Sequence, residues 1–578
     1  YGLEVPQWLD HVDLMEVAPG VGVSLKMYMG RMHSRQMQDL PYDPNATTTL
    51  AQRLEISTYC GNDLSGTADL KREVSERLEL REELGKRYGI DLRSKSDAQI
   101  AEAVIRARLS FRPERLELPH GYRFKYEAPP YVRFVSPELH KVLRLVQSLD
   151  FVVNDLTQDL AEWELIDDQG KPIKHGLQMP AALKGLDICI GESVYRMGIG
   201  GLHSQEEARS YYTRPGICTV SDHDVSSYYP SLILNLGMYP PQLGPEFLDI
   251  YRAIYTERLQ AKKAKDKTTA DGLKIALNGT FGKLGNKYSI LYSPNLLIQT
   301  TVTGQLCLLM LIESLELVGV RVVSANTDGI VLVTPAGLEG VRDAVIALWE
   351  SSTGLTTEAT VYRSIHFRDV NNYLAVLSQP EGDKLYKGKG IFTTSGVLNN
   401  KHPSKDIAAQ AVAAYLCTGK PIEQTVSECR DIRQFLEIRR VKGGGKLMTH
   451  GLDPKAKVGA KREALLRAGW HEPAKGLWAP VTGEPPLSLD QAYKLLCNEG
   501  GHYLGKAVRW YVSTKRGQYI AYTGSGNRVA DSQGAQPCMT LPDAMPDDVD
   551  YQHYIEEAHD ILRGLGVTAG TAVPPTAP

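Results

Sequence analysis

Short apolar runs bounded by turn residues predict buried strands in the middle of the chain. Residues 217–220 and residues 330–333 are such runs, and both contain β-branched side chains. Residues 247–265 lack glycine and proline, which favours a helix. Residues 299–318 form a long apolar stretch. Because polar side chains such as Gln305 interrupt this stretch, we expect a buried helix and not a membrane span.

Weaker patterns on both sides of this region predict further elements. Helices are expected over residues 55–64, 68–88, 96–109, 139–149, 338–351, 406–416 and 422–435. Strands are expected over residues 356–362 and 503–512. Residues 567–578 are rich in Ala, Thr, Pro and Gly, and this composition is typical of a disordered tail.

Each of the two central apolar runs is joined to a carboxylate. Asp222 and Asp224 follow the first run, and Asp328 precedes the second. A carboxylate at a strand end or hairpin tip is held rigidly enough to bind a hard divalent cation. Because Asp224 and Asp328 lie far apart in the sequence, they predict a site that is assembled only by folding.

Cationic residues lie between these two carboxylates in the sequence. Arg258 and Lys262 are four residues apart and share one face of the helix expected there. Lys274 and Asn278 repeat this spacing on a second expected helix. Cations that face paired carboxylates suit a substrate made of phosphates and Mg²⁺.

The three segments that carry these residues are similar to motifs A, B and C of the family B DNA polymerases. Motif A of that family reads D-x-x-S-L-Y-P-S, and it is matched by Asp224, Ser227, Tyr229, Pro230 and Ser231, with Tyr228 in the position of Leu. Motif B reads K-x-x-x-N-S-x-Y-G, and it is matched by Lys274, Asn278 and Gly282, with Gly279 and Phe281 replacing Ser and Tyr. Motif C reads D-T-D-S, and the chain has Asn326, Thr327, Asp328 and Gly329. The motifs occur in the order of the family, and the resemblance is closest to bacteriophage enzymes.

The resemblance implies a DNA-templated DNA polymerase that uses two Mg²⁺ ions, for which Mn²⁺ can substitute. Asp224 and Asp328 are then the catalytic carboxylates and metal ligands, with the Val225 carbonyl as a further oxygen. Asn326 is tolerated, since the second carboxylate of motif C binds the metals. The nucleotide-binding residues implied are Ser227, Tyr228, Tyr229, Arg258, Lys262, Lys274 and Asn278. Tyr229 is expected under the sugar, where its ring excludes a 2′-hydroxyl.

Residues outside the three motifs are expected to contact DNA. Gly200 and Gly201 resemble the Y-x-G-G/A element of the family, and Tyr373 resembles the end of its K-x-Y element. The K-x-Y lysine is absent, so Lys387 and Lys389 are expected to supply the charge to the primer backbone. Lys442, in a basic glycine-rich loop, is expected to contact the duplex backbone.

The N-terminal region resembles one piece of a proofreading nuclease. Tyr59 and Asp63 match the Y-x-x-x-D spacing of the third motif of the 3′–5′ exonuclease in family B enzymes, and the two earlier motifs are missing. The resemblance therefore implies a truncated exonuclease with little or no nuclease activity.

The expected fold class is a multidomain α+β protein with a right-hand polymerase arrangement: a palm with an antiparallel sheet, short helical fingers and a mainly helical thumb. A partial RNase H-like exonuclease domain is expected to precede it. The expected ranges are 1–180 for the exonuclease-like and connecting region, 181–246 and 291–400 for the palm, 247–290 for the fingers, and 401–566 for the thumb and C-terminal region with an insertion near 448–498. The short intervals between the motifs leave little room for protein-priming insertions, so we expect a nucleic-acid primer.

Composition limits the remaining functions. The chain of 578 residues has a net charge of −3, so any DNA-binding surface must be a local basic groove. Its 8 cysteines are scattered without a C-x-x-C pair, which argues against structural zinc and favours a reducing cytoplasm, that of the host if the protein is viral. Expected partners are primer–template DNA, deoxynucleoside triphosphates and accessory replication proteins, with no membrane and the chain as a monomer.

Two other functions are compatible with the same sequence. The departures at Asn326 and Gly329 are also consistent with a catalytically inactive palm that binds DNA as a scaffold. An RNA-templated polymerase would use the same paired carboxylates. The choice of template leaves no signal in these motifs. A primer-extension assay with both templates separates these possibilities.

Overall fold

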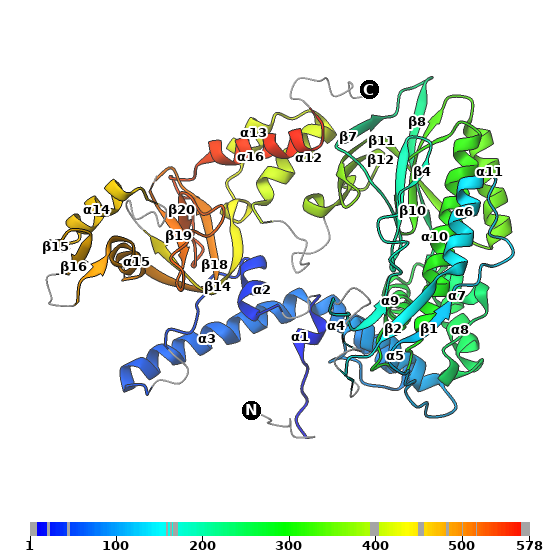
Figure 1. The fold of residues 1–578 in the computed structure, drawn as a ribbon, viewed down its shortest axis with the longest axis horizontal. Coiled ribbons are helices and arrows are strands. Elements are labelled where there is room, and N and C mark those ends of the chain that lie inside the picture. Colours follow the sequence, from blue (N-terminus) through cyan, green and yellow to red (C-terminus); the bar gives the residue numbers. More distant parts are fainter. Residues whose placement is uncertain are drawn as a thin grey trace. The chain divides into compact units, whose positions relative to one another are not determined.

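The computed structural model describes residues 8–19, 23–42, 47–157, 160–161, 165, 171–393, 404–448, 456–480, 485–499, 501–515 and 517–567. The chain forms two compact units, which are described separately (Figure 1). The first unit spans Tyr1–Ala18, Ser75–Lys389 and Gly564–Val567. The second spans Pro19–Val74, Gly390–Arg563 and Thr568–Pro578. The tail expected to be disordered lies outside the described residues from position 568 onward.

The first unit is built on a ten-stranded antiparallel sheet with the strand order β13-β12-β11-β8-β10-β9-β6-β5-β4, in which β7 also pairs with β11. The strands are β4 (Ile188–Ile190), β5 (Ser193–Met197), β6 (Leu202–Ser204), β7 (Arg209–Tyr212), β8 (Cys218–Val225), β9 (Arg321–Asn326), β10 (Gly329–Pro335), β11 (Thr357–Asp369), β12 (Asn372–Glu381) and β13 (Lys384–Lys389). Strands β8, β10 and β11 confirm the strands predicted at 217–220, 330–333 and 356–362. The predicted antiparallel sheet is therefore present.

The register of this sheet aligns the motifs. Asp224 on β8 lies opposite Gly329 on β10, and on its other side it lies opposite Glu358 on β11. Strand β9 leads directly into β10 through a tight turn that contains Asp328. The end of β8 therefore lies between the turn that carries motif C and the beginning of β11.

Helices cover one face of this sheet and share its core (Figure 1). They are α6 (Pro137–Ser148), α7 (Tyr228–Leu236), α10 (Pro294–Leu317) and α11 (Glu339–Thr353). Helix α10 is the one helix of the described chain that is long and apolar enough to cross a membrane, and 83% of its most apolar window is buried within the protein. This confirms the buried helix predicted over residues 299–318.

Four further helices of the first unit form a bundle with a core of its own. They are α4 (Ser75–Tyr88), α5 (Asp97–Arg108), α8 (Glu246–Lys263) and α9 (Lys267–Lys283). Side-chain caps mark the beginning of two of these helices: Asp266 accepts a hydrogen bond from the Thr269 N–H before α9, and Ser96 and Gln99 form a capping box before α5. The helices predicted over 96–109 and 247–265 are thus confirmed. The helix predicted over 68–88 is interrupted at Val74, where α3 (Leu50–Glu73) ends before α4 begins.

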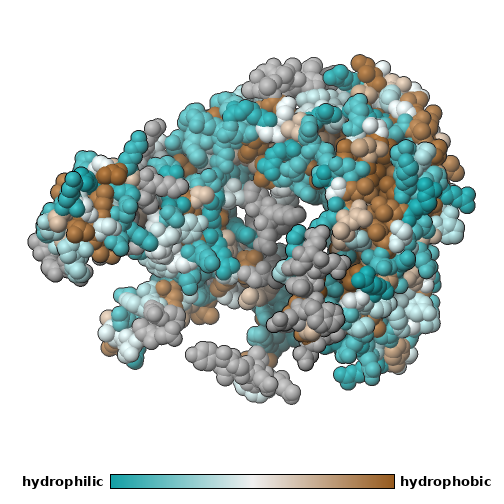
Figure 2. Space-filling model, in the orientation of Figure 1, coloured by the Kyte–Doolittle hydropathy of each residue, from teal (hydrophilic) through white to brown (hydrophobic). Residues whose placement is uncertain are grey.

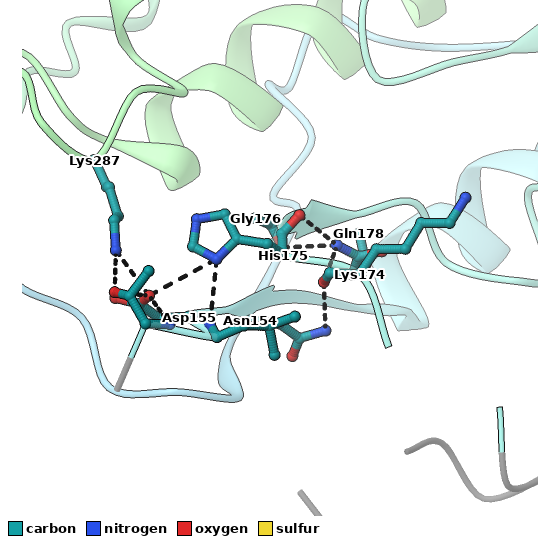
Figure 3. A network of polar contacts seen from close by, with 9 residues as sticks. Asn154, Asp155, Lys174, His175, Gly176, Gln178 and Lys287 are labelled. Carbon is teal, nitrogen blue, oxygen red and sulfur yellow. Dashed lines mark hydrogen bonds and ion pairs between the residues drawn. The ribbon is translucent and has the colours of Figure 1, made fainter. Parts of the chain in front are cut away.

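A small sheet of β1 (Tyr122–Lys125), β2 (Asp150–Asn154) and β3 (Gly176–Gln178) completes the first unit. The segment after α9 is attached to the end of β2, because Lys287 Nζ lies 2.8 Å from Asp155 Oδ1 (Figure 3). This hydrogen bond holds the pKa of Asp155 well below its usual range. His175 accepts a hydrogen bond of 3.1 Å from the Leu156 N–H at Nδ1, so the same polar network also joins β2 to the beginning of β3.

The described part of the region predicted as a partial RNase H-like exonuclease is mainly helical before Tyr122 and contains the small sheet β1-β2-β3 after it. Before Tyr122 the described elements are helices, namely α1 (Leu14–Val17), α2 (Leu25–Arg31), α3, α4 and α5. The open sheet of a nuclease domain needs several paired strands, and the pattern of residues 50–108 favours helices instead. Helices α2 and α3 belong to the second unit and α4 and α5 to the first. The exonuclease remnant therefore stays a prediction.

The second unit contains a four-stranded antiparallel sheet in the order β19-β14-β18-β20. Its strands are β14 (Glu437–Met448), β18 (His502–Val512), β19 (Tyr519–Tyr522) and β20 (Ala535–Pro537). Along the chain, the sheet is preceded by helices α12 (Asp406–Thr418) and α13 (Ile422–Glu428) and followed by helix α16 (Tyr551–Gly564). The mainly helical thumb is not confirmed, because paired strands form the centre of this range. Strand β14 even includes the glycine-rich segment, where Gly443 and Gly444 adopt positive φ at a bulge.

The predicted insertion near 448–498 has its own small sheet, β15-β16-β17. Its elements are α14 (Val458–Arg467), β15 (His471–Ala474), β16 (Leu477–Ala479), β17 (Leu487–Ser488) and α15 (Leu489–Glu499). Trp470, Trp478 and Leu465 form its core. Hydrophobic side chains are also visible on its surface at the left of Figure 2, and Leu466 is 60% exposed. The predicted boundaries of palm, fingers and thumb stay predictions.

Candidate functional site

A pocket of about 860 Å³ opens on the first unit where the strand ends of the sheet meet the helix bundle. One wall is the end of β8 together with the turn that carries Asp328. The opposite wall consists of α8 and α9. The pocket therefore brings the predicted carboxylates and the predicted cations into one space.

Asp224 and Asp328 meet on the sheet wall of this pocket. The Val225 N–H donates a hydrogen bond of 2.7 Å to the carbonyl oxygen of Asp328, so the backbones of motif A and motif C are joined directly. Thr327, with a φ of 64°, forms the tight turn that presents Asp328. A non-glycine residue in this left-handed region is a strained conformation, and such strain concentrates at functional sites.

The structure explains why glycine stands at position 329, where motif C of the family has serine. A Cβ atom built at Gly329 would lie 2.2 Å from Asp224 Oδ1. The Asp224 carboxylate therefore occupies the space that a serine side chain would need at this position. The absence of a side chain at Gly329 is a packing requirement of the observed Asp224 orientation.

Lys387, whose predicted contact with DNA stays a prediction, lies on the carboxylates. Lys387 Nζ is 2.9 Å from Asp222 Oδ2 and 2.8 Å from Asp224 Oδ2. The Tyr362 hydroxyl donates a further hydrogen bond of 2.9 Å to Asp222 Oδ2. Asp222 is thus a buried anchor for Lys387. Sequence reasoning missed this role because Lys387 reaches β8 across β12 and β11, and no local pattern contains that arrangement.

The electrostatics of the sheet wall favour added positive charge. Burial and the neighbouring Asp224 carboxylate raise the pKa of Asp222 above its usual value. The same two causes raise the pKa of Asp328, although its side chain is exposed to the pocket. Burial lowers the pKa of Lys387, but the two carboxylates outweigh this and raise it above its usual value. Three carboxylates with one lysine leave excess negative charge.

The donor set on this wall fits hard divalent cations. Asp224 and Asp328 supply carboxylate oxygens, and Val225 borders the same pocket. In the described part of the chain, no three His, Cys, Asp or Glu side chains converge into a closed metal cluster. Mg²⁺ commonly binds through one or two carboxylates and completes its coordination with water and substrate phosphates. An open site with two carboxylates is therefore compatible with Mg²⁺ bound together with a phosphorylated substrate.

The helix wall presents the predicted cations. Arg258 and Lys262 on α8 and Lys274 and Asn278 on α9 all line the pocket. Arg258 donates a hydrogen bond to Ser227 Oγ, and its Nε is buried with no hydrogen-bond partner among the described residues. A buried donor without an acceptor is costly, and a bound anion would satisfy it.

Glu358, which the sequence marks as a candidate auxiliary carboxylate on the strand expected over 356–362, lies on the edge of the pocket. Lys262 Nζ lies 2.7 Å from Glu358 Oε1, and this hydrogen bond lowers the pKa of Glu358. Ser226 also donates to the same oxygen over 2.8 Å. Since Glu358 is exposed and already paired, it positions Lys262 at the boundary between the two walls.

Tyr229 is held between two neighbours. Its ring stacks on Phe281 of α9 with centroids 4.1 Å apart and an angle of 15° between the planes. Its hydroxyl donates to the carbonyl oxygen of Gly200. Tyr228 packs behind it in the core, and Ser227, with a φ of 49°, forms the turn before them. Phe281, which replaces a tyrosine of motif B, keeps this stacking without a hydroxyl.

The residues predicted to contact DNA lie in different parts of the structure. Gly200 and Gly201 precede β6, and a Cβ at Gly201 would lie 3.0 Å from a side-chain atom of Thr327. Tyr373 on β12 pairs with Lys389 on β13. Lys442 lies on β14 in the second unit. Contacts of these residues with DNA stay predictions.

Tyr59 and Asp63 do not belong to the pocket. Both lie on α3 in the second unit. Lys26 forms an ion pair with Asp63, and its Nζ lies 4.5 Å from the centroid of the Tyr59 ring. These contacts attach α3 to α2 and give both residues a structural role.

Comparisons with known proteins place few constraints on the function. No family model matches the chain, and no curated protein matches it. Among solved structures, it is similar to the family B DNA polymerase from the hyperthermophilic archaeon Pyrobaculum calidifontis, with a sequence identity of 14% and a TM-score of 0.40. The match covers 91% of this chain, and the chain spans only 58% of the length of that polymerase. A likeness of this degree does not by itself identify the function.

Proposed function

We propose that the protein is a DNA-templated DNA polymerase that extends a primer 3′-hydroxyl with deoxynucleoside triphosphates. The observation that carries this proposal is the pocket of about 860 Å³ in which Asp224 and Asp328 face Arg258, Lys262 and Lys274. Nucleotidyl transfer needs carboxylates near the reacting phosphate and cations around the other phosphates. The pocket contains both groups on opposite walls.

The sheet wall would hold the reacting centre. Asp224, Asp328 and the Val225 carbonyl would hold a pair of Mg²⁺ ions, or Mn²⁺ in their place, which would supply positive charge beside the primer hydroxyl and the leaving pyrophosphate. Asp222 does not face the substrate, because it is buried behind Lys387 and Tyr362. Lys387 then keeps the carboxylates oriented and neutralises part of their mutual repulsion.

The helix wall would bind the triphosphate. Arg258, Lys262 and Lys274 offer charge where it develops in the transition state. Among the described residues the buried Nε of Arg258 has no hydrogen-bond partner, so it offers one donor that a phosphate oxygen can satisfy. Asn278 lies one helical turn beyond Lys274, where it can contact the nucleotide next to its phosphates.

Tyr229 would select deoxynucleotides. Stacking on Phe281 and the hydrogen bond to Gly200 fix the ring from two sides, so it cannot move aside without losing both contacts. A fixed ring below the sugar would clash with a 2′-hydroxyl. Ser227 and Tyr228 hold the turn that sets this ring.

DNA binding belongs to the same proposal. Gly200, Gly201, Tyr373 and Lys389, which belong to the same unit as the pocket, would contact primer or template, and Lys442 would contact the duplex backbone. The proposed setting is DNA replication in the cytoplasm, that of the host if the protein comes from a phage, with the chain acting as a monomer alongside accessory replication proteins. Nuclease activity is not part of the proposal, since Tyr59 and Asp63 pair with Lys26.

A primer-extension assay tests this function. The protein is incubated with Mg²⁺, a labelled primer on a DNA or an RNA template, and either deoxynucleotides or ribonucleotides. Extension on the DNA template with deoxynucleotides is expected. Binding of primer–template without extension would instead indicate an inactive scaffold, and extension on RNA alone would indicate an RNA-templated enzyme. Asn326 gives no reason to expect inactivity, because its side-chain amide donates over 2.9 Å to the Val370 carbonyl oxygen.

A further inference from the structure

One face of helix α9 lines the pocket, and another face packs against the neighbouring helices α4 and α5. One face carries Lys274 and Asn278 and lines the pocket. The other face carries Gly272 and Gly279, which are seven residues apart and point at α4 and α5. Whatever sets the position of α4 and α5 therefore acts on the helix that presents the proposed phosphate-binding side chains.

The contact between α5 and α9 is too close for a side chain. A Cβ at Gly279 would lie 2.8 Å from the Ala101 Cβ and 2.9 Å from the Asp97 carbonyl oxygen. A Cβ at Gly272 would lie 3.0 Å from Leu84 of α4. Glycine in a helix interior is destabilising relative to alanine, so these glycines are explained by the approach of the neighbouring helices. This also accounts for Gly279 at the serine position of motif B.

Charged contacts join the same helices to α8. Arg108 of α5 lies 2.8 Å from Glu257, and Arg87 of α4 lies 3.3 Å from the same carboxylate. Glu257 directly precedes Arg258, the phosphate-binding residue proposed on this helix. At the other end of α8, Glu246 accepts hydrogen bonds of 3.0 Å and 2.9 Å from the Ser110 N–H and Oγ. Helix α8 is thus held at both ends.

Helices α4 and α5 are also joined to each other. Arg81 of α4 is fully buried and donates over 2.6 Å to Asp97 at the beginning of α5 and over 2.9 Å to the Lys95 carbonyl oxygen. Asp97 is half exposed, but its loss would leave the buried guanidinium of Arg81 without its carboxylate partner, which is unfavourable. The two helices therefore behave as one body against α8 and α9.

We propose that α4 and α5 are a positioning element of the nucleotide site. They hold α8 and α9 at the separation at which Arg258, Lys274 and Asn278 reach one triphosphate. Arg108 and the contact of Gly279 with Ala101 are the positioning groups, and neither touches the substrate. This inference rests on the proposed function, because it takes the pocket to be a nucleotide site.

The first test compares two arginines of α5. Arg108→Gln removes the ion pair to α8, whereas Arg106→Gln removes a pair of 2.8 Å to Glu102 on the same helix and is the matched control. In steady-state primer extension, Arg108→Gln is expected to raise the KM for deoxynucleotides by about tenfold, with kcat changed by less than about twofold. The Kd for primer–template is expected to stay the same. Arg106→Gln is expected to match the parent protein.

Hydrogen–deuterium exchange provides a readout that does not depend on activity. Amides of α8 and α9 are expected to exchange faster in Arg108→Gln than in Arg106→Gln, because a weakened helix interface opens more often. Equal exchange and equal KM in the two variants would overturn the inference. Absence of extension by the parent protein would overturn the proposed function instead, so the two failures are distinguishable.

A second pair of variants tests the glycine contact. Gly279→Ala places a methyl group against Ala101 and is expected to raise the KM by a similar factor of about ten. Ala101→Gly in the same chain removes one of the two close atoms and is expected to restore part of the loss. If Gly279→Ala fails to fold, the recovery of folding by the double variant reads out the same contact. A double variant no better than Gly279→Ala would contradict it.

Discussion

The two walls of the pocket hold their charged residues by different means. On the sheet wall, strand register and the hydrogen bond from Val225 to Asp328 place the carboxylates through the backbone. On the helix wall, Arg258 and Lys274 are presented by helices that are held through side-chain packing and the ion pairs of Glu257. Backbone ladders leave less freedom than side-chain contacts. We therefore expect the sheet wall to be rigid and the helix wall to be adjustable.

The largest expected effect comes from the sheet wall. Asp328→Ala is expected to lower primer extension by about a thousandfold or more, because the carboxylate acts on the reacting centre. Primer–template binding, measured by fluorescence anisotropy, is expected to remain close to that of the parent. Asp343→Ala on α11, whose side chain is 63% exposed, is the matched control. Extension at the parent rate by the Asp328 variant would remove this residue from the proposed mechanism.

The burial of His366 in the sheet predicts that the free energy of unfolding depends on pH. His366 on β11 is buried between Ser210 and Ser364, and burial lowers its pKa to about 4 from 6.5. As the pH falls from about 6.5 to about 4, the unfolded chain binds a proton that the folded protein does not, so the free energy of unfolding decreases.

The size of this pH effect can be measured by denaturant titration. It is on the order of 3 kcal/mol for His366, since each pKa unit corresponds to about 1.4 kcal/mol. His366→Gln is expected to make the free energy of unfolding less dependent on pH between pH 4 and 6.5 by that amount. His140→Gln, at an exposed position of α6, is the matched control. Identical pH profiles for all three proteins would show that His366 is accessible to protons.

Substitutions on the helix wall are expected to change the KM for deoxynucleotides more than kcat. Lys274→Ala is expected to raise the KM for deoxynucleotides by about tenfold, a change that corresponds to 1.4 kcal/mol. Steady-state kinetics with Lys263→Ala as control checks this, because Lys263 lies on α8 but does not line the pocket. A loss confined to kcat would place Lys274 at the reacting centre and so break the distinction between the walls.

The smallest expected effect tests the space around Asp224. Gly329→Ala places a Cβ where Asp224 Oδ1 now lies, so the carboxylate must rotate away from its present position. A reduction of kcat by about fivefold is expected, since the side chain can move at modest cost. Gly340→Ala on α11 adds a methyl group to open space and is the control. If single-turnover rates of the two variants agree, the space at Gly329 has no effect on the chemistry.

Local patterns in the sequence determined the elements that carry the site. The runs at 217–220 and 330–333 form β8 and β10, and residues 247–265 form α8. The spacing of apolar residues and the absence of glycine and proline favour an element within a few residues, so the local sequence is enough to predict it. The order of the motifs also predicted that Asp224 and Asp328 would meet, and both line one pocket.

Only the tertiary structure decided what surrounds those elements. Lys387 reaches Asp222 and Asp224 because three strand pairings bring β13 and β8 together, and Gly279 is required because α5 approaches α9. Helices α4 and α5 likewise join the bundle beside the pocket through contacts that no local pattern contains. Contacts between residues distant in the chain depend on how whole strands and helices pack, and the residues involved carry no local signal of their partners.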